Sequence, residues 1–157
     1  MSFGAFGGRR DLMEDYDPTR PNALFHAGTF NNNVVSLSAG IAGLRDVLTD
    51  ERLAALNARG DRLRDALNRA GDGLLHTSGS GSLMTIHPGP RAYNASEPPD
   101  PRRELVKRLV FFELLDAGQW IAARGMLALS LPITDALCDE FANAFAAIVA
   151  RHRDVLA

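Results

Sequence analysis

The chain has 157 residues, 46% of them hydrophobic and 23% charged, which is enough apolar material for one substantial core. Seventeen lysines and arginines against nineteen aspartates and glutamates give a formal net charge of -2, so we expect no attraction to nucleic acid or to an anionic membrane. The apolar runs are far shorter than a bilayer span, and Cys138 is alone, so we predict no membrane segment, no intrachain disulfide and a cytoplasmic location.

The first 48 residues combine a glycine-rich start with one apolar helix. Residues 1–8, MSFGAFGG, predict part of a buried strand, and a short helix is expected over residues 9–16. A longer helix over residues 34–48 is predicted by apolar side chains at intervals of three and four residues. These side chains are Val34, Leu37, Ile41, Leu44 and Leu48.

The segment HAGTFNNN, residues 26–33, leads into that helix. Asn31, Asn32 and Asn33 supply acceptors for the first free N–H groups of the helix. The N–H groups that remain face the region ahead of Thr29, where an anion such as phosphate could bind. An ordinary helix cap with no ligand is the alternative interpretation.

The next segment predicts a helix that begins at residue 50 and ends at Gly71 or Gly73, and then two short strands, 74–77 and 82–87. The intervening Gly-Ser-Gly-Ser sequence, residues 79–82, has the composition of a phosphate-binding loop. It lies between two strands and does not precede a helix, so a hairpin turn is favoured. Five prolines in residues 88–101 predict a surface loop.

The last third predicts a helix over residues 102–117 that ends at Gly118, strands over 120–123 and 126–131, and a final helix capped by Thr134. The final helix should bury Leu137, Phe141 and Phe145, with Ile148 and Val149. Residues 50–157 are therefore expected to be α+β, with helices packed on one face of a small antiparallel sheet.

Two observations bear on chemistry. Arg124 lies between two apolar runs. It is either a solvated turn residue or a side chain that binds a carboxylate or phosphate. The four histidines and Cys138 show no pair at the spacing of metal ligands, so we predict no metal site.

Three motifs occur in a characteristic order: GAFGGRRDLM (4–13), HAGTFNNNVVSLSAGIAGL (26–44) and ARGMLALSLPIT (123–134). Together they resemble the C-terminal part of class III pyridoxal-phosphate-dependent aminotransferases, most of all the glutamate-1-semialdehyde aminomutase branch. The resemblance implies the type I aminotransferase fold. Residues 1–48 would be a remnant of the large domain with the inter-domain helix, and residues 49–157 would be the C-terminal small domain.

The resemblance also implies a homodimer with active sites at the subunit interface. Gly28 and Thr29 match the Gly-Thr step that reaches the cofactor phosphate of the neighbouring subunit. Arg124 lies close to where some members keep an arginine near the substrate or cofactor pocket. The sequence NNNVV replaces the family's usual Gly-Asn-Pro-Leu-Ala type of sequence, so we expect the entry to the helix to differ from that of the family.

The family's Schiff-base lysine corresponds to a position before Met1. The chain's one lysine, Lys107, lies among Arg102, Arg103 and Arg108 on a predicted surface helix, so it is not expected to replace that lysine. The resemblance implies pyridoxal 5'-phosphate as the cofactor, but not that this chain binds it alone.

Two functions follow as hypotheses. The first is a C-terminal fragment of an enzyme that transfers an amino group between an amino compound and a carbonyl. Such a fragment would be inactive alone and would associate with the rest of a split enzyme or with a full-length homologue. The second is a non-catalytic dimerisation or interaction module derived from the same family.

Overall fold

A computed structural model describes residues 4–29, 31, 33–93 and 96–157, and the chain divides into two compact units, Met1–Thr49 and Asp50–Ala157. In the first unit, α1 (Arg10–Met13) continues as a 3-10 turn, η1 (Glu14–Tyr16). Helix α2 (Val34–Ala42) continues as a π-helical turn, η2 (Gly43–Val47). The helices expected over residues 9–16 and 34–48 are therefore confirmed.

The opening segment differs from its prediction. Residues 4–8 form no strand, and the Phe6 side chain is 56% exposed, with its ring edge-on to Tyr16 and His26. Residues 1–3 of the predicted strand lie outside the described residues. A strand is stable only when another strand pairs with it, and the described part of the first unit contains none.

Helix α2 begins as the asparagine run predicts. The Asn33 side chain accepts a hydrogen bond from Ser36 N at 3.0 Å, which satisfies one of the free donors of the first turn. Asn32 lies outside the described residues. The apolar side chains that predicted the helix remain exposed, at 73% for Val34, 61% for Ile41 and 53% for Leu44. The apolar face is therefore present without a covering surface in the described chain.

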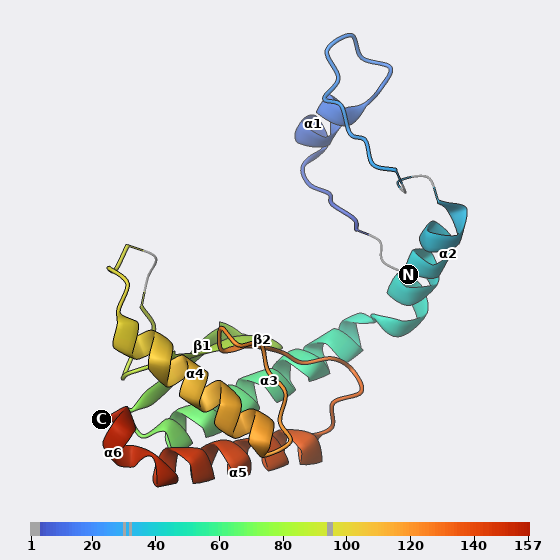
Figure 1. Cartoon of the computed structure of the whole chain (residues 1–157). Helices are drawn as coiled ribbons and strands as arrows, with labels where there is room; N and C mark the ends of the chain where they lie inside the picture. Colours follow the sequence, from blue (N-terminus) through green and yellow to red (C-terminus); the bar gives the residue numbers. More distant parts are fainter. Residues whose placement is uncertain (1–3, 30, 32, 94–95) are drawn as a thin grey trace. The chain divides into compact units, whose positions relative to one another are not determined.

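The second unit is α+β, as predicted (Figure 1). Helix α3 (Asp50–Gly71) leads into the hairpin of β1 (Leu75–Ser80) and β2 (Leu83–Pro88). Helix α4 (Pro101–Asp116), strand β3 (Met126–Ala128), helix α5 (Asp135–Arg151) and helix α6 (Arg153–Leu156) complete the unit. The sheet is antiparallel with the order β1-β2-β3, and its register pairs Thr77 with Ile86 and Met84 with Leu127.

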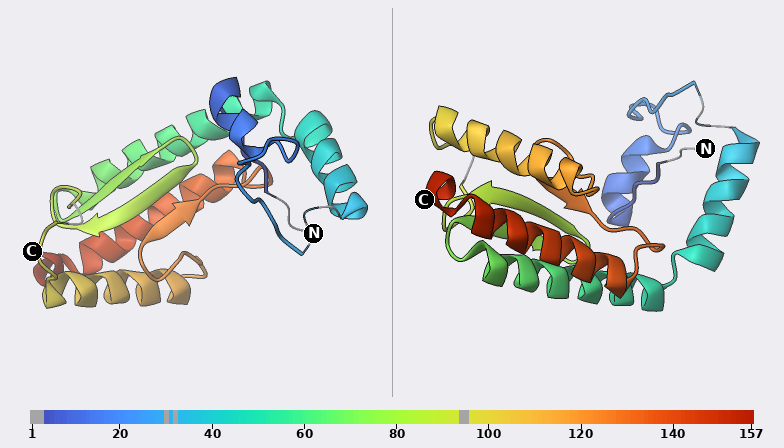
Figure 2. Two further views of the ribbon diagram at one scale, coloured as in Figure 1. Left: turned by 90° about the horizontal axis from the view of Figure 1, so that it is seen from above. Right: turned by 60° about the horizontal axis from the view of Figure 1, so that its bottom comes forward.

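The core lies between the sheet and the helices, and α3 runs alongside α5 (Figures 1 and 2). Phe145, Leu67 and Leu114 are 0% exposed in this core, where one helix face of each of α5, α3 and α4 is buried. Asn68 ties α3 to β1, because its side chain donates to Thr77 O at 2.9 Å and accepts from Thr77 N at 2.7 Å. The hairpin is thereby fixed on α3 by both apolar burial and hydrogen bonds.

Three predictions in the last third of the chain need correction. Residues 120–123 form no strand: the Trp120 side chain is 83% exposed, and the segment turns before β3 begins. Strand β3 ends at Ala128, where 126–131 was expected, and Leu137 is 50% exposed although its helix face is otherwise buried. Residues 119–129 instead contain a tight turn and contribute to one wall of a pocket.

Candidate functional site

Gly28 and Thr29 lie on an exposed turn ahead of α2. The turn is closed by Asn31 N, which donates to Gly28 O at 3.0 Å. A Cβ atom added at Gly28 would meet the end of the exposed Asn31 side chain, which can rotate away, so this contact does not by itself require glycine. Among the described residues the Thr29 hydroxyl has no hydrogen-bond partner, and it is therefore available to an external acceptor such as a phosphate oxygen.

This geometry suits a phosphate without requiring one. The turn offers an exposed hydroxyl and exposed backbone close in sequence to the start of a helix, where negative charge is favoured. Asn33 caps only one of the free N–H groups of α2. That Gly28 and Thr29 bind the cofactor phosphate stays a prediction.

Arg124 lies in a tight turn formed by Ala122 to Gly125, which we call the Arg124 turn. Gly125 N donates to Ala122 O at 2.8 Å, and Ala122 N donates to Met126 O at 3.1 Å. The guanidinium is exposed and donates through Nη2 to the sulfur of Met126 at 3.0 Å. In the part of the chain that the structure describes, no carboxylate pairs with Arg124. Its charge is therefore available to an external anion.

A pocket of about 320 Å³ lies beside this turn, within the second unit. Ala122 and Met126 belong to its lining, so the pocket and the Arg124 turn share residues. The other lining residues are mostly apolar: Leu63, Gln119, Trp120, Ile121, Leu127, Ala128, Leu129, Ile133, Leu137, Cys138 and Phe141. Burial raises the pKa of the Cys138 thiol, so this cysteine is not an activated nucleophile. Arg124 itself does not line the pocket, but its guanidinium contacts the lining residue Met126.

Lys107 is held by its neighbours on α4 and on the loop before it. Its Nζ lies 2.7 Å from Glu104 Oε1 and 5.1 Å from the centre of the Tyr93 ring, and its side chain is only 16% exposed. Partial burial acts to lower the pKa of Lys107, but Glu104 and Tyr93 outweigh it and raise the pKa above the ordinary value. The amine is therefore held as an ammonium ion.

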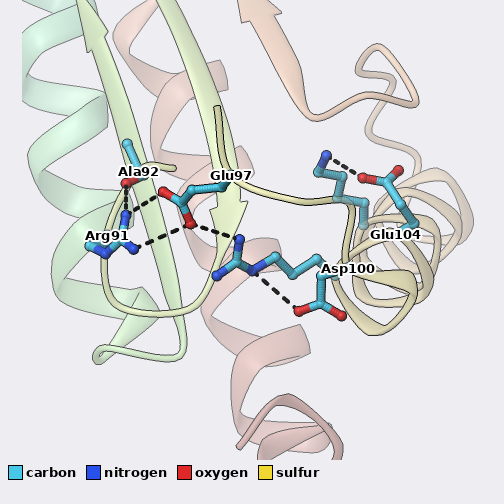
Figure 3. A network of polar contacts seen from close by, with 7 residues as sticks. Arg91, Ala92, Glu97, Asp100 and Glu104 are labelled. Carbon is cyan, nitrogen blue, oxygen red and sulfur yellow. Dashed lines mark hydrogen bonds and ion pairs between the residues drawn. The ribbon is translucent and has the colours of Figure 1, made fainter. Parts of the chain in front are cut away.

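The loop that carries Tyr93 is fixed to α4 by a network of ion pairs (Figure 3). Glu97 accepts from Arg91 at 2.7 Å and from Arg103 at 3.2 Å, and Arg103 also lies 3.4 Å from Asp100. Arg103 and Lys107 both lie over the Tyr93 ring. These cations are already paired with carboxylates, so the cluster stabilises the loop and offers no free charge to a ligand.

Sequence reasoning selected Gly28, Thr29 and Arg124 but missed Met126, Gly125 and the pocket. Gly28 and Thr29 belong to the first unit and Arg124 to the second. The Arg-Gly pair inside an apolar run indicates a turn, and that pattern alone could have replaced the strand expected over residues 120–123. The pocket has no such sequence pattern, because residues from α3, β3 and α5 form it together.

No protein-family model matches the chain, but comparison with known proteins finds similar sequences among aminotransferases and aminomutases. The β-phenylalanine transaminase of Variovorax paradoxus is 42% identical over 99% of this chain, which corresponds to 36% of that protein. A glutamate-1-semialdehyde 2,1-aminomutase of Rhodopirellula baltica is 34% identical over 89% of this chain and 33% of that protein. The chain thus spans about a third of the length of these relatives.

Solved structures agree with this result. The crystal structure of a β-phenylalanine aminotransferase from Variovorax paradoxus matches 94% of this chain and 35% of that chain, with a TM-score of 0.83 and 37% identity. A transaminase with bound pyridoxal phosphate matches 95% of this chain and 34% of that chain, with a TM-score of 0.74 and 29% identity. In sequence and in fold, this chain is therefore homologous to class III aminotransferases and corresponds to about a third of their length.

Proposed function

We propose that this chain is the C-terminal part of a pyridoxal-phosphate-dependent aminotransferase or aminomutase, able to contribute binding groups but not the catalytic amine. Residues 1–48 would belong to the large domain and the inter-domain helix, and residues 49–157 would form the small domain. The pocket and the charge of Arg124 fit a substrate with a carboxylate and an apolar group. The name of the Variovorax relative suggests an aromatic β-amino acid as one such substrate.

The observation that carries the proposal is the state of Lys107. A lysine that attacks a carbonyl needs an unprotonated amine, which proteins obtain by lowering its pKa. In this chain the ion pair with Glu104 raises the pKa of Lys107, and Tyr93 covers one side of the ammonium. The single lysine of the chain is thus unsuited to nucleophilic attack.

Pyridoxal phosphate, when bound, supplies the electron sink for amino-group transfer. The roles of this chain would then be binding and orientation. Thr29 Oγ1 and the exposed backbone of its turn would donate to the phosphate, and the Arg124 guanidinium would bind the substrate carboxylate. Because the two groups belong to different units, both would act only in an assembly that fixes those units together.

The test of the fragment hypothesis is to add pyridoxal phosphate to the purified chain and reduce with borohydride. We expect no specific adduct at Lys107 by mass spectrometry and no transamination. Lys107→Arg is the matched control, because it removes the amine but keeps the charge beside Glu104. A stoichiometric adduct at Lys107 that the variant lacks, together with turnover, would disprove the proposal.

We expect activity only when the part of the relatives that this chain does not span is supplied. Co-expression with the amino-terminal two-thirds of the Variovorax transaminase should give a complex that transaminates β-phenylalanine. Thr29→Val is nearly isosteric and removes one hydroxyl, so it should weaken cofactor retention in that complex. Thr29→Ser should retain the cofactor as the wild type does. If the wild type, Thr29→Val and Thr29→Ser retained the cofactor equally, Thr29 would have no role in cofactor binding.

The exposed apolar face of α2 supports a second candidate, a non-catalytic dimerisation or interaction module. Val34, Val35 and Ile41 are each more than half exposed, and a stable protein rarely leaves such a helix face uncovered. Light scattering of the purified chain separates the two functions. A discrete folded dimer without cofactor would favour the module, whereas aggregation that the missing part relieves would favour the fragment.

A further inference from the structure

The Arg124 turn is attached to the core through its last residue, Gly125. Ile86 N, in the middle of β2, donates to Gly125 O at 2.9 Å, and Ile86 itself is 3% exposed. Gly125 has φ +87°, and a Cβ atom added there would lie 2.6 Å from Ile86 O. Both the backbone conformation and the close approach to β2 therefore require glycine.

The guanidinium of Arg124 is held in a different way. Its Nη2 donates to Met126 Sδ at 3.0 Å, and Met126 begins strand β3 opposite Thr85 of β2. A thioether is a weak and uncharged acceptor, so it restricts the side chain without neutralising the charge. A carboxylate at the same place would hold the arginine more strongly but would compete with a substrate carboxylate.

From these contacts we propose that Gly125 and Met126 are positioning residues for Arg124. They hold its guanidinium at the edge of the apolar pocket, where it would bind the carboxylate of a ligand whose apolar group enters the pocket. The proposal rests on the proposed function, because it assumes that Arg124 binds the substrate. Gly125 fixes the backbone on β2, and Met126 fixes the guanidinium. Met126 also lines the pocket, so the same side chain contacts the apolar part of the ligand.

A binding experiment on the 157-residue chain tests this directly. The probe is 3-phenylpropionate, with the neutral 3-phenylpropanamide as its control, and the backbone amide resonances of the pocket-lining residues report binding by NMR. Arg124→Gln should abolish the preference for the carboxylate over the amide. Gly125→Ala should weaken carboxylate binding by about tenfold, the equivalent of one charge-assisted hydrogen bond.

Gly118→Ala is the matched control for the glycine. Gly118 has φ +77°, so alanine there carries a similar backbone strain, but nothing lies within 4 Å of its added Cβ. It should bind the probe as the wild type does. Hydrogen exchange of the Ile86 amide should accelerate in Gly125→Ala and stay unchanged in Gly118→Ala, because only the first substitution disturbs the bond to Gly125 O.

Met126→Leu keeps the volume and the apolar contact but removes the sulfur acceptor. It should weaken binding of the carboxylate and leave binding of the amide unchanged. If Arg124→Gln binds the carboxylate as the wild type does, Arg124 has no substrate role and the positioning proposal is refuted with it. If Arg124→Gln loses the carboxylate while Gly125→Ala and Met126→Leu keep it, the substrate role stands and positioning alone is refuted.

Discussion

Replacing Gly60 by alanine should destabilise the second unit, although the same change stabilises most helices. Gly60 is a buried residue in the middle of α3, at the place where the hairpin turn crosses the helix. A Cβ atom there would overlap the carbonyl oxygen of Gly81 and lie 2.6 Å from its carbonyl carbon. These are backbone atoms, so they cannot rotate away as the end of a side chain could, and the turn must move.

The magnitude follows from three contributions. Alanine gains about 1 kcal/mol over glycine in a helix interior. Overpacking of a well-packed contact costs about 1–3 kcal/mol. Movement of the turn also strains two hydrogen bonds, from Gly81 N to Asp61 Oδ1 at 3.0 Å and from Ser82 N to Asn57 Oδ1 at 3.1 Å, each worth about 1 kcal/mol. If both hydrogen bonds are lost, we therefore expect a net loss of about 2–4 kcal/mol in the free energy of unfolding.

Urea unfolding followed by circular dichroism measures this loss, and Gly71→Ala on the same helix is the control. An added Cβ at Gly71 meets Leu75 Cβ at 3.5 Å, which is an ordinary contact, so that variant should be neutral or slightly stabilised. The reasoning would be refuted if Gly60→Ala were as stable as Gly71→Ala. That result would mean that the hairpin moves away from α3 at no cost.

Two further predictions concern acid stability and helix capping. Burial, His76 and Lys107 lower the pKa of His87 from 6.5, so the unfolded state binds a proton more readily. The free energy of unfolding should fall from about pH 7.5 to about pH 5 more steeply in the wild type than in His87→Gln, and equal slopes would contradict this. Thr134 Oγ1 accepts from Leu137 N at 3.3 Å at the start of α5, so Thr134→Ala should cost about 1 kcal/mol in urea unfolding. Thr134→Ser should recover most of that loss, and no difference between the two variants would exclude a capping role.

Helices were predictable because their patterns are local. The periodicity of α3, α4 and α5 and the caps at Asn33 and Thr134 lie within a few residues of one another in sequence, so they can be read without knowledge of the fold. The hairpin was predictable for the same reason, since Gly79 to Ser82 mark a turn between two apolar runs. Its strand β1 extends to Ser80, further than the composition indicated.

The incorrect predictions concern segments whose structure depends on contacts with residues elsewhere in the chain. Residues 4–8 and 120–123 have strand-like composition, yet a strand forms only where another one pairs with it, and pairing is a property of the whole fold. In the same way, periodicity identified the apolar stripe of α4 but not its exposure: Leu105 is 64% exposed and Phe112 56% exposed, whereas Val106 is buried.

The sequence by itself therefore determined the α+β class, the order of the helices and the family resemblance, whereas the roles of Gly28, Thr29 and Arg124 stay predictions. The tertiary structure alone decided that Lys107 lies over the Tyr93 ring, that Gly125 O accepts a hydrogen bond from Ile86 N, and that a pocket lies beside the Arg124 turn. The physical reason is that contacts between a cation and a ring, close backbone approach and cavities depend on distances between residues far apart in the chain. Short-range composition does not encode those distances.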